Sequence, residues 1–128
     1  MTEGRLPVAL VQVPEILNSG QMRRFLDEMQ ICMNTIRPRI VLDCSRLRRM
    51  DRAVIHLMLC GLEETLKHNG DLRLAALPEG ASREFYLSGL ERLFDVFETI
   101  PDAVNSFYPA AKGAPLLQDI DRSSNTTA

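Results

Sequence analysis

Four arginines, Arg46, Arg48, Arg49 and Arg52, crowd one short stretch of the chain. Arginine favours planar, bidentate recognition of carboxylate or phosphate groups. Asp51 lies in the same stretch, just before apolar residues that recur at helical spacing, and is a predicted N-cap. The first turn of such a helix offers N–H groups and a positive dipole to an anion. The pattern therefore indicates a contact for an acidic partner, a site for a nucleotide or other phosphate ligand, or solvated loop arginines.

A buried strand and a helix must position this stretch. The β-branched run before Asp43 predicts a strand over Ile40–Cys44, in the middle of a sheet. We expect Asp43 and Ser45 to hydrogen-bond to the loop that follows. The helix after Asp51 should end at Asn69-Gly70, with Gly70 in the left-handed conformation. Its expected buried face contains Val54, Leu57, Met58, Gly61, Leu62 and Leu66.

Strands and helices alternate along the remaining sequence. Alternating or apolar runs predict strands over Pro7–Val13, Leu72–Leu77 and Val96–Thr99. Asn18-Ser19-Gly20 is a predicted turn and N-cap for a first helix, which should end before Pro38. The apolar face of this helix is formed by Met22, Phe25, Leu26, Met29, Cys32, Met33 and Ile36. Two shorter helices are predicted over Ser82–Ser88, closed by Gly89, and over Pro101–Phe107. This order predicts an α/β fold in which about four helices cover a mixed sheet of four or five strands.

The length and composition indicate one globular domain. The chain has 128 residues, 45% of them hydrophobic and 25% charged, which is ordinary for a domain with its own core. We place this domain at residues 1–108. Residues 109–128 are rich in Pro, Ser, Thr and Ala and are expected to form a flexible C-terminal tail.

Several classes of function fit the composition poorly. A net charge of −2 argues against a general nucleic-acid binder. No apolar run approaches the roughly 18 residues that a membrane span needs, and the N-terminus does not resemble a signal peptide. Cys32, Cys44 and Cys60 are expected to be reduced core residues of a cytoplasmic protein. His56 and His68 lack metal-ligand spacing, and no nucleophile–base pattern is present, so we expect no metal, no cofactor and no enzyme activity.

Three segments resemble landmarks of STAS domains, the anti-sigma factor antagonist family. In that family a strand ending in D-L-S leads to M-D-S-S-G-L, and this chain keeps Asp43, Ser45, Met50 and Asp51 in register. The run GDLRL from Gly70 is similar to the family's G-G-x-L-x-L strand entry, and SGLERLF from Ser88 to its T-G-L-D-x-L-F corner. The resemblance covers about residues 8–107. The family usually has one more strand before Pro7, which only residues 1–6 remain to supply.

The resemblance also implies where a partner binds. In the family a partner anti-sigma kinase binds this helix N-terminus and phosphorylates the second serine. Here Arg52, Ala53 and Val54 stand at the two serines and the glycine, and Leu17-Asn18 matches an L-D pair, so neither serine hydroxyl is present. The implied partner-binding residues are Asn18, Ser19, Arg48, Arg49, Asp51, Arg52, Ala53 and Val54, with no phosphorylation site at Ala53.

Together these observations predict a regulatory protein-binding module of bacterial, cytoplasmic type without a serine phosphoswitch. The expected partner is an anti-sigma factor, a related kinase or a subunit of another complex, and a homodimer is possible. Two alternatives remain: an accessory or scaffold subunit of a lipid transporter or stress-signalling complex, and a small-anion or nucleotide sensor at the arginine-rich loop.

Overall fold

The computed structural model describes residues 7–15 and 18–108. Four strands form one sheet: β1 (Ala9–Gln12), β2 (Arg39–Asp43), β3 (Asp71–Ala75) and β4 (Asp95–Phe97). They lie in the order β1-β2-β3-β4, and all three pairings are parallel. The antiparallel pairing of the mixed sheet that we expected is therefore absent from the described residues. The extra strand considered for residues 1–6 lies outside them.

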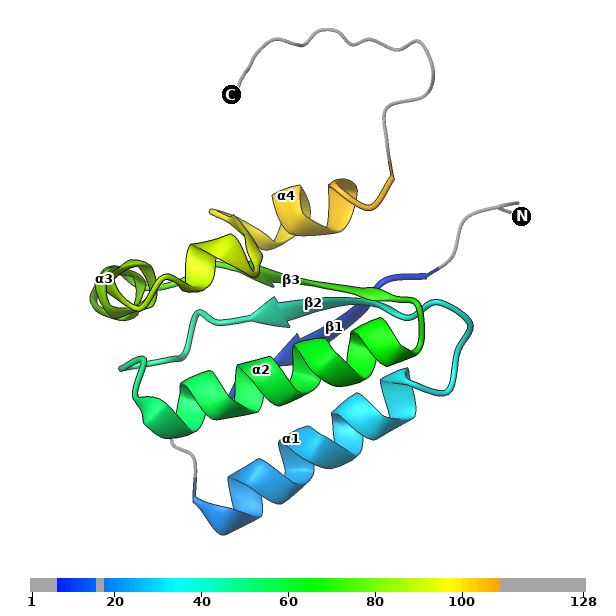
Figure 1. Ribbon diagram of the computed structural model, residues 1–128, viewed down its shortest axis with the longest axis horizontal. Coiled ribbons are helices and arrows are strands. Elements are labelled where there is room, and N and C mark those ends of the chain that lie inside the picture. Colours follow the sequence, from blue (N-terminus) through cyan, green and yellow to red (C-terminus); the bar gives the residue numbers. More distant parts are fainter. Residues whose placement is uncertain (1–6, 16–17, 109–128) are drawn as a thin grey trace, which may run out of the picture.

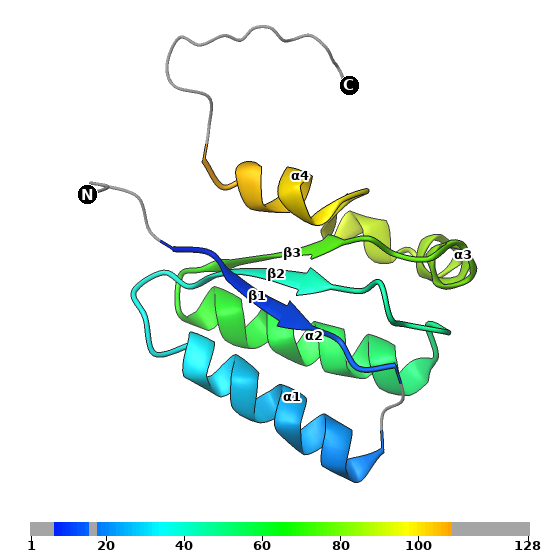
Figure 2. The same cartoon turned by 180° about the vertical axis from the view of Figure 1, so that it is seen from behind.

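Helices cover both faces of the sheet. The long helices α1 (Ser19–Cys32) and α2 (Arg52–Lys67) lie side by side on one face, and α4 (Ile100–Asn105) covers the other (Figures 1 and 2). The helix α3 (Glu79–Leu87) lies at one end of the sheet and leads through a short 3₁₀ turn (Leu90–Arg92) into β4. The predicted number and order of helices and strands are confirmed.

Alternation along the strands divides the core into two clusters. Ile40, Leu42 and Leu74 point toward α1 and α2 and belong to the larger cluster. Val41 and Ala75 belong to a smaller cluster with Ala103 and Phe107 on the α4 side. The inner strand β2 is thus buried on both faces, as its near-continuous apolar run indicates, whereas Leu10 on the edge strand β1 is 51% exposed.

The first long helix is shorter than its apolar spacing suggests. It ends at Cys32, whereas the predicted face continued to Ile36, which is 78% exposed. Leu26, placed on the same face, is also exposed. The segment after the helix turns back through Arg37, whose φ of 53° is left-handed and ends any helical path. Pro38 follows this turn and does not itself end the helix.

The end of α2 corrects one expectation and explains a glycine. The left-handed residue is Asn69 (φ 61°) rather than Gly70. The N–H groups of Asn69 and Gly70 bond back to the carbonyls of Leu66 and Thr65, which is a Schellman cap. A Cβ on Gly70 would lie 2.1 Å from the Pro38 carbonyl oxygen, so only glycine fits there. Gly89, predicted to close the helix over Ser82–Ser88, follows α3 with a left-handed φ of 76°.

The predicted buried face of α2 is right at its centre and wrong at its end. Leu57 and Met58 are buried, Leu62 is half-buried, and Leu66 is 54% exposed. Among the cysteines, Cys44 is buried and Cys32 is half-buried, but Cys60 is exposed and is no core residue. All three are free thiols.

Candidate functional site

The arginine-rich loop lies at the carboxyl end of the parallel sheet. Because all four strands run the same way, the ends of β1 and β2 and the starts of α1 and α2 lie at one end of the molecule (Figures 1 and 2). This edge of an α/β sheet is where ligands usually bind. The N-termini of α1 and α2 therefore share one surface with the loop between β2 and α2.

Buried anchors hold this loop in place. The Asp43 carboxylate is only 7% exposed and accepts hydrogen bonds from the Ser45 N–H (3.0 Å) and from Gln12 Nε2 (3.2 Å). Leu47 and Met50 insert their side chains into the larger core cluster. The expectation that Asp43 bonds to the loop is confirmed. Arg46, Arg48 and Arg49 lie between these anchors and are exposed, and Arg52, in the first turn of α2, is exposed as well.

The helix α2 begins at the predicted residue. The Asp51 carboxylate accepts a hydrogen bond from the Val54 N–H at 3.0 Å and so caps the helix. Arg52 and Ala53 in the first turn have exposed side chains, and their N–H groups have no carbonyl ahead of them in the helix. Val54 differs from them, because its side chain is 4% exposed and packs in the larger core cluster. The Val54 side chain, expected to contact a partner, is therefore part of the core.

Two of the four arginines are bound to neighbouring side chains. Arg48 Nε lies 3.0 Å from Glu15 Oε2 in a solvent-exposed ion pair. Arg46 Nη1 donates to Gln12 Oε1 at 3.3 Å. Arg49 and Arg52 are exposed and make no side-chain hydrogen bond or ion pair with the described residues. These two guanidinium groups are free to meet an acidic group.

The start of α1 forms the second part of this surface. The Asn18 side chain accepts a hydrogen bond from the Gln21 N–H at 2.8 Å and caps the helix, as its position predicted. Asn18 and Ser19 are both exposed. Leu17, which was matched together with Asn18, lies outside the described residues. We call Asn18, Ser19, Arg48, Arg49, Asp51, Arg52 and Ala53 the docking surface.

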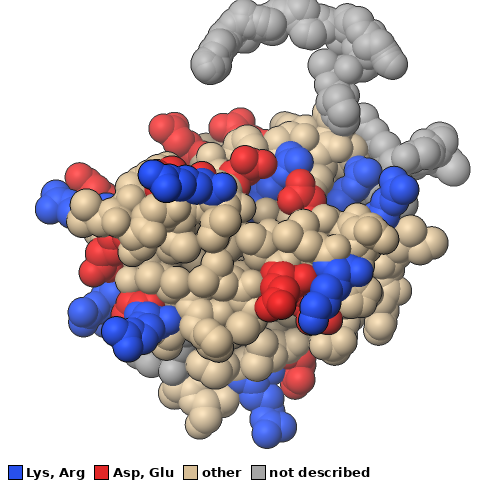
Figure 3. Space-filling view, in the orientation of Figure 1, with Lys and Arg blue, Asp and Glu red and all other residues tan. Residues whose placement is uncertain are grey.

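A cleft of about 380 Å³ next to these residues was not predicted from the sequence. It lies between the end of β1 and the first turns of α1, and its walls carry both signs of charge, with Arg24 and Arg46 near Glu15 and Glu28. Figure 3 shows the same mixing of acidic and basic side chains over the face that it draws, with wide uncharged areas between them. Such mixed charge suits a protein partner better than a single small anion.

One contact at this edge also escaped the sequence analysis. The Met50 N–H donates to Glu84 Oε1 at 2.8 Å, which ties the loop to α3. The two residues are 34 positions apart, and their meeting depends on where α3 packs. No local pattern marks Glu84 as part of the site.

The described residues contain no group of three potential metal ligands. His56 Nε2 lies 3.6 Å from the Cys60 sulfur, one turn along the exposed side of α2, and His68 Nδ1 contacts the Glu64 carbonyl.

Burial raises the pKa of the Cys44 thiol to about 12, so this cysteine stays protonated at neutral pH and is a poor nucleophile. Burial, with a smaller contribution from Glu28, also raises the pKa of Cys32. None of the helices in the described ranges is long and apolar enough to cross a membrane.

Comparison with known proteins identifies the fold. A candidate anti-sigma factor antagonist from Thermotoga maritima has a TM-score of 0.61 and 17% sequence identity, over 80% of this chain and 83% of that one. An anti-sigma-factor antagonist (STAS) domain protein from Planctomyces limnophilus has a TM-score of 0.66 and 13% identity, over 78% of this chain and 90% of that one. No curated protein sequence matches this chain.

The sequence model of the STAS domain matches residues 2–103. The match begins earlier than the resemblance found from motifs, so it includes the residues that precede β1. It spans most of the 128-residue chain, and the landmarks at Asp43, Gly70 and Gly89 all fall inside it. The chain therefore belongs to the STAS domain family.

Proposed function

We propose that this protein is a non-enzymatic, cytoplasmic regulatory module that binds another protein through the docking surface. The observation that carries the proposal is the exposed first turn of α2, where Arg49 and Arg52 have no partner among the described residues and flank an Asp51-capped helix start. A helix N-terminus adds a positive dipole to these two charges. An acidic protein surface is the matching partner.

The fold family supports one class of partner. The two solved relatives are described as anti-sigma factor antagonists or domains of that kind. We therefore expect an anti-sigma factor, a kinase related to one, or an equivalent regulator. Net charge near zero and mixed surface charge favour a protein over nucleic acid as the bound species.

The first turn of α2 has no serine at the two positions where the family carries its serines. A phosphate adds about −1.5 to −2 charges and would disrupt an interface built for an acidic partner. Arg52 and Ala53 occupy the first turn of α2, and neither has a hydroxyl. In this proposal Ala53 keeps the module permanently in the form that binds.

A second candidate function is that of a permanent subunit in a larger assembly, such as a transporter or stress-signalling complex. The observation that favours it is the set of large apolar side chains exposed on the α1–α2 side: Leu26, Ile31 and Leu66 are 46%, 70% and 54% exposed. Stable complexes bury such residues. The small-anion sensor considered for the arginine-rich loop is less favoured, because Arg46 and Arg48 are already bound to neighbouring side chains.

Affinity purification from the native host distinguishes these functions. Wild-type protein and the Ala53→Glu variant are compared, since a glutamate places negative charge where the family carries its phosphate. We expect wild type to retain a regulator or kinase and the variant to lose it. Equal recovery of the same partner by both proteins would contradict docking through this helix start, and recovery of transporter or scaffold subunits would support the second candidate.

A further inference from the structure

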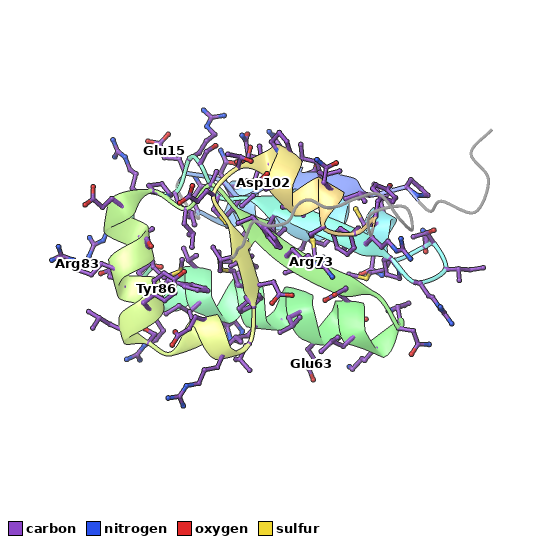
Figure 4. All side chains as sticks on the ribbon, turned by 90° about the horizontal axis from the view of Figure 1, so that it is seen from above. Glu15, Glu63, Arg73, Arg83, Tyr86 and Asp102 are labelled. Carbon is purple, nitrogen blue, oxygen red and sulfur yellow. The ribbon has the colours of Figure 1, made fainter. Side chains whose placement is uncertain are left out.

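A cleft at the opposite end of the sheet carries a second cluster of arginines. Arg37, Arg39 and Arg73 line a space of about 320 Å³ at the amino-terminal ends of β2 and β3. Ser106 and Phe107, at the end of α4, close one side of it. Figure 4 looks onto this side of the sheet and places Arg73 beside β3, well away from Glu15 at the other end. The cleft is thus separate from the docking surface.

The charge of the cleft is strongly unbalanced. Its three guanidinium groups share a single carboxylate, that of Asp71, and Asp71 pairs with Arg73 Nη2 at 3.0 Å. Two positive charges on the lining therefore have no counter-charge among the described lining residues. Arg37 makes no side-chain hydrogen bond or ion pair with the described residues, and Arg39 reaches only the Phe107 carbonyl, at 3.5 Å.

Arg73 is held rigidly at the back of the cleft. Its guanidinium carbon lies 4.1 Å from the centre of the Phe107 ring, a cation–π contact, and Nη1 donates to the Ser106 hydroxyl. Its Nε–H is buried and has no hydrogen-bond partner among the described residues. Arg73 supplies a fixed positive charge. Arg37 and Arg39 still have guanidinium N–H groups that bond to no described residue.

The two turns that carry the cleft are fixed in an unusual conformation. Arg37 and Asn69 both have left-handed backbones, with φ of 53° and 61°. The Asp71 N–H donates to the Pro38 carbonyl at 2.9 Å, and the missing side chain of Gly70 lets the two turns touch. Non-glycine residues rarely adopt positive φ, and such residues cluster at ligand sites. The contact between these two turns holds the Arg37 backbone in one orientation.

We propose that this cleft binds a phosphate monoester, with Arg37 and Arg39 donating to the phosphoryl oxygens and Arg73 contributing charge from behind. A monoester carries about −1.5 to −2 charges at neutral pH, which matches the excess of two guanidinium groups. The planar fork of arginine fits phosphoryl oxygens in pairs. This site is independent of the proposed protein-binding function and lies at the far end of the sheet.

The test is an NMR titration of the ¹⁵N-labelled full chain with inorganic phosphate and with glycerol phosphate, at constant ionic strength set with chloride. We expect saturable shifts of the Gly70 and Ser106 amides. The double variant R37Q/R39Q should weaken binding by at least about tenfold. The double variant R49Q/R52Q removes the same charge from the docking surface and should bind phosphate like wild type. Unsaturable shifts, or equal affinity of wild type and R37Q/R39Q, would overturn the proposal.

Two further measurements secure the interpretation. The Arg37 side chain is exposed, so the single variant R37Q should keep the wild-type spectrum and still lose affinity, which separates ligand contact from misfolding. Sedimentation with vesicles of phosphatidylcholine containing phosphatidic acid distinguishes a lipid headgroup from a soluble ester. Co-sedimentation that R37Q/R39Q abolishes would assign a lipid source. Binding of glycerol phosphate without co-sedimentation would assign a soluble one.

Discussion

The backbone N–H of Met50 donates a hydrogen bond to the Glu84 carboxylate, with an N···O distance of 2.8 Å. Met50 directly precedes the N-cap Asp51, and its side chain is buried in the larger core cluster. Glu84 lies on α3, so this one contact connects α3 to the start of α2. The orientation of the docking surface therefore depends on how α3 packs.

Removing the Glu84 carboxylate should destabilise the protein. We expect Glu84→Ala to lower the free energy of unfolding by about 1–3 kcal/mol, because the Met50 N–H loses a charged acceptor. Glu84→Gln should cost less, since an amide oxygen can still accept. Urea denaturation measures both, with Glu63→Ala, an exposed site on α2, as the control. An unchanged midpoint for Glu84→Ala would show that the contact contributes nothing.

Three leucines on α2 should respond in the order of their burial. Leu57 is 4% exposed, Leu62 is half-buried and Leu66 is 54% exposed. Leu57→Ala should cost about 2–5 kcal/mol of unfolding free energy, Leu62→Ala less, and Leu66→Ala little. Thermal or urea denaturation gives the three values. A larger loss at Leu66 than at Leu57 would contradict the assigned helix face.

The three thiols should react with iodoacetamide in the order Cys60, Cys32, Cys44. Cys60 is exposed, whereas burial raises the pKa of Cys32 and raises the pKa of Cys44 from 9.0 to about 12. Only the thiolate is alkylated, and the buried thiols form it least. Mass spectrometry of the native protein over time measures the order. Early modification of Cys44 would mean that the strand end opens.

The raised Cys44 pKa also affects stability at high pH. The unfolded chain loses this proton near pH 9, whereas the folded chain keeps it until about pH 12. Stability should therefore fall as the pH rises above 9, and Cys44→Ala should reduce that fall. Urea midpoints measured on both sides of pH 9 for wild type and variant test this.

The native protein should carry no phosphate in the first turn of α2. After incubation with ATP and its kinase partner, we expect unmodified Arg52 and Ala53, because neither has a hydroxyl. Ala53 is exposed, so Ala53→Ser should fold normally and provide a hydroxyl for the kinase. Intact-mass and peptide mass spectrometry read the result. Stoichiometric phosphate on Ser19 or Ser45 of the wild type would mean that the switch has moved rather than disappeared.

Local chemistry explains which features the sequence predicted. The caps at Asn18 and Asp51 and the place of Gly89 at the end of α3 depend on neighbouring residues only, and all three are confirmed. Ile36 and Leu66 continued the helical spacing, but the end of α1 at Cys32 and the position of α2 on the sheet left them exposed. Spacing shows which face is apolar without showing how far the neighbouring element extends.

Contacts between distant segments were beyond prediction. Glu84 meets Met50, and Arg39 and Arg73 meet Phe107, only because α3 and α4 pack where they do. Val54 stood within the implied partner-binding residues, yet the rotation of α2 directs its side chain into the core. Residue types alone did not show that Arg52 and Ala53 are exposed whereas the neighbouring Val54 is buried.

Charge reversal at Arg52 tests the docking surface most directly. Wild type, Arg52→Glu and Lys67→Glu are titrated against the partner purified from the native host, with association rates and affinities recorded. Lys67 ends the same helix, about 22 Å from Arg52 at 1.5 Å per residue, and receives the same change in charge.

An acid in the first turn suits the helix dipole, so Arg52→Glu should fold normally. We predict that Arg52→Glu weakens binding by at least about tenfold, roughly 1.4 kcal/mol, mainly through slower association, and that Lys67→Glu does not. Equal affinity of wild type and Arg52→Glu would contradict docking at the start of α2.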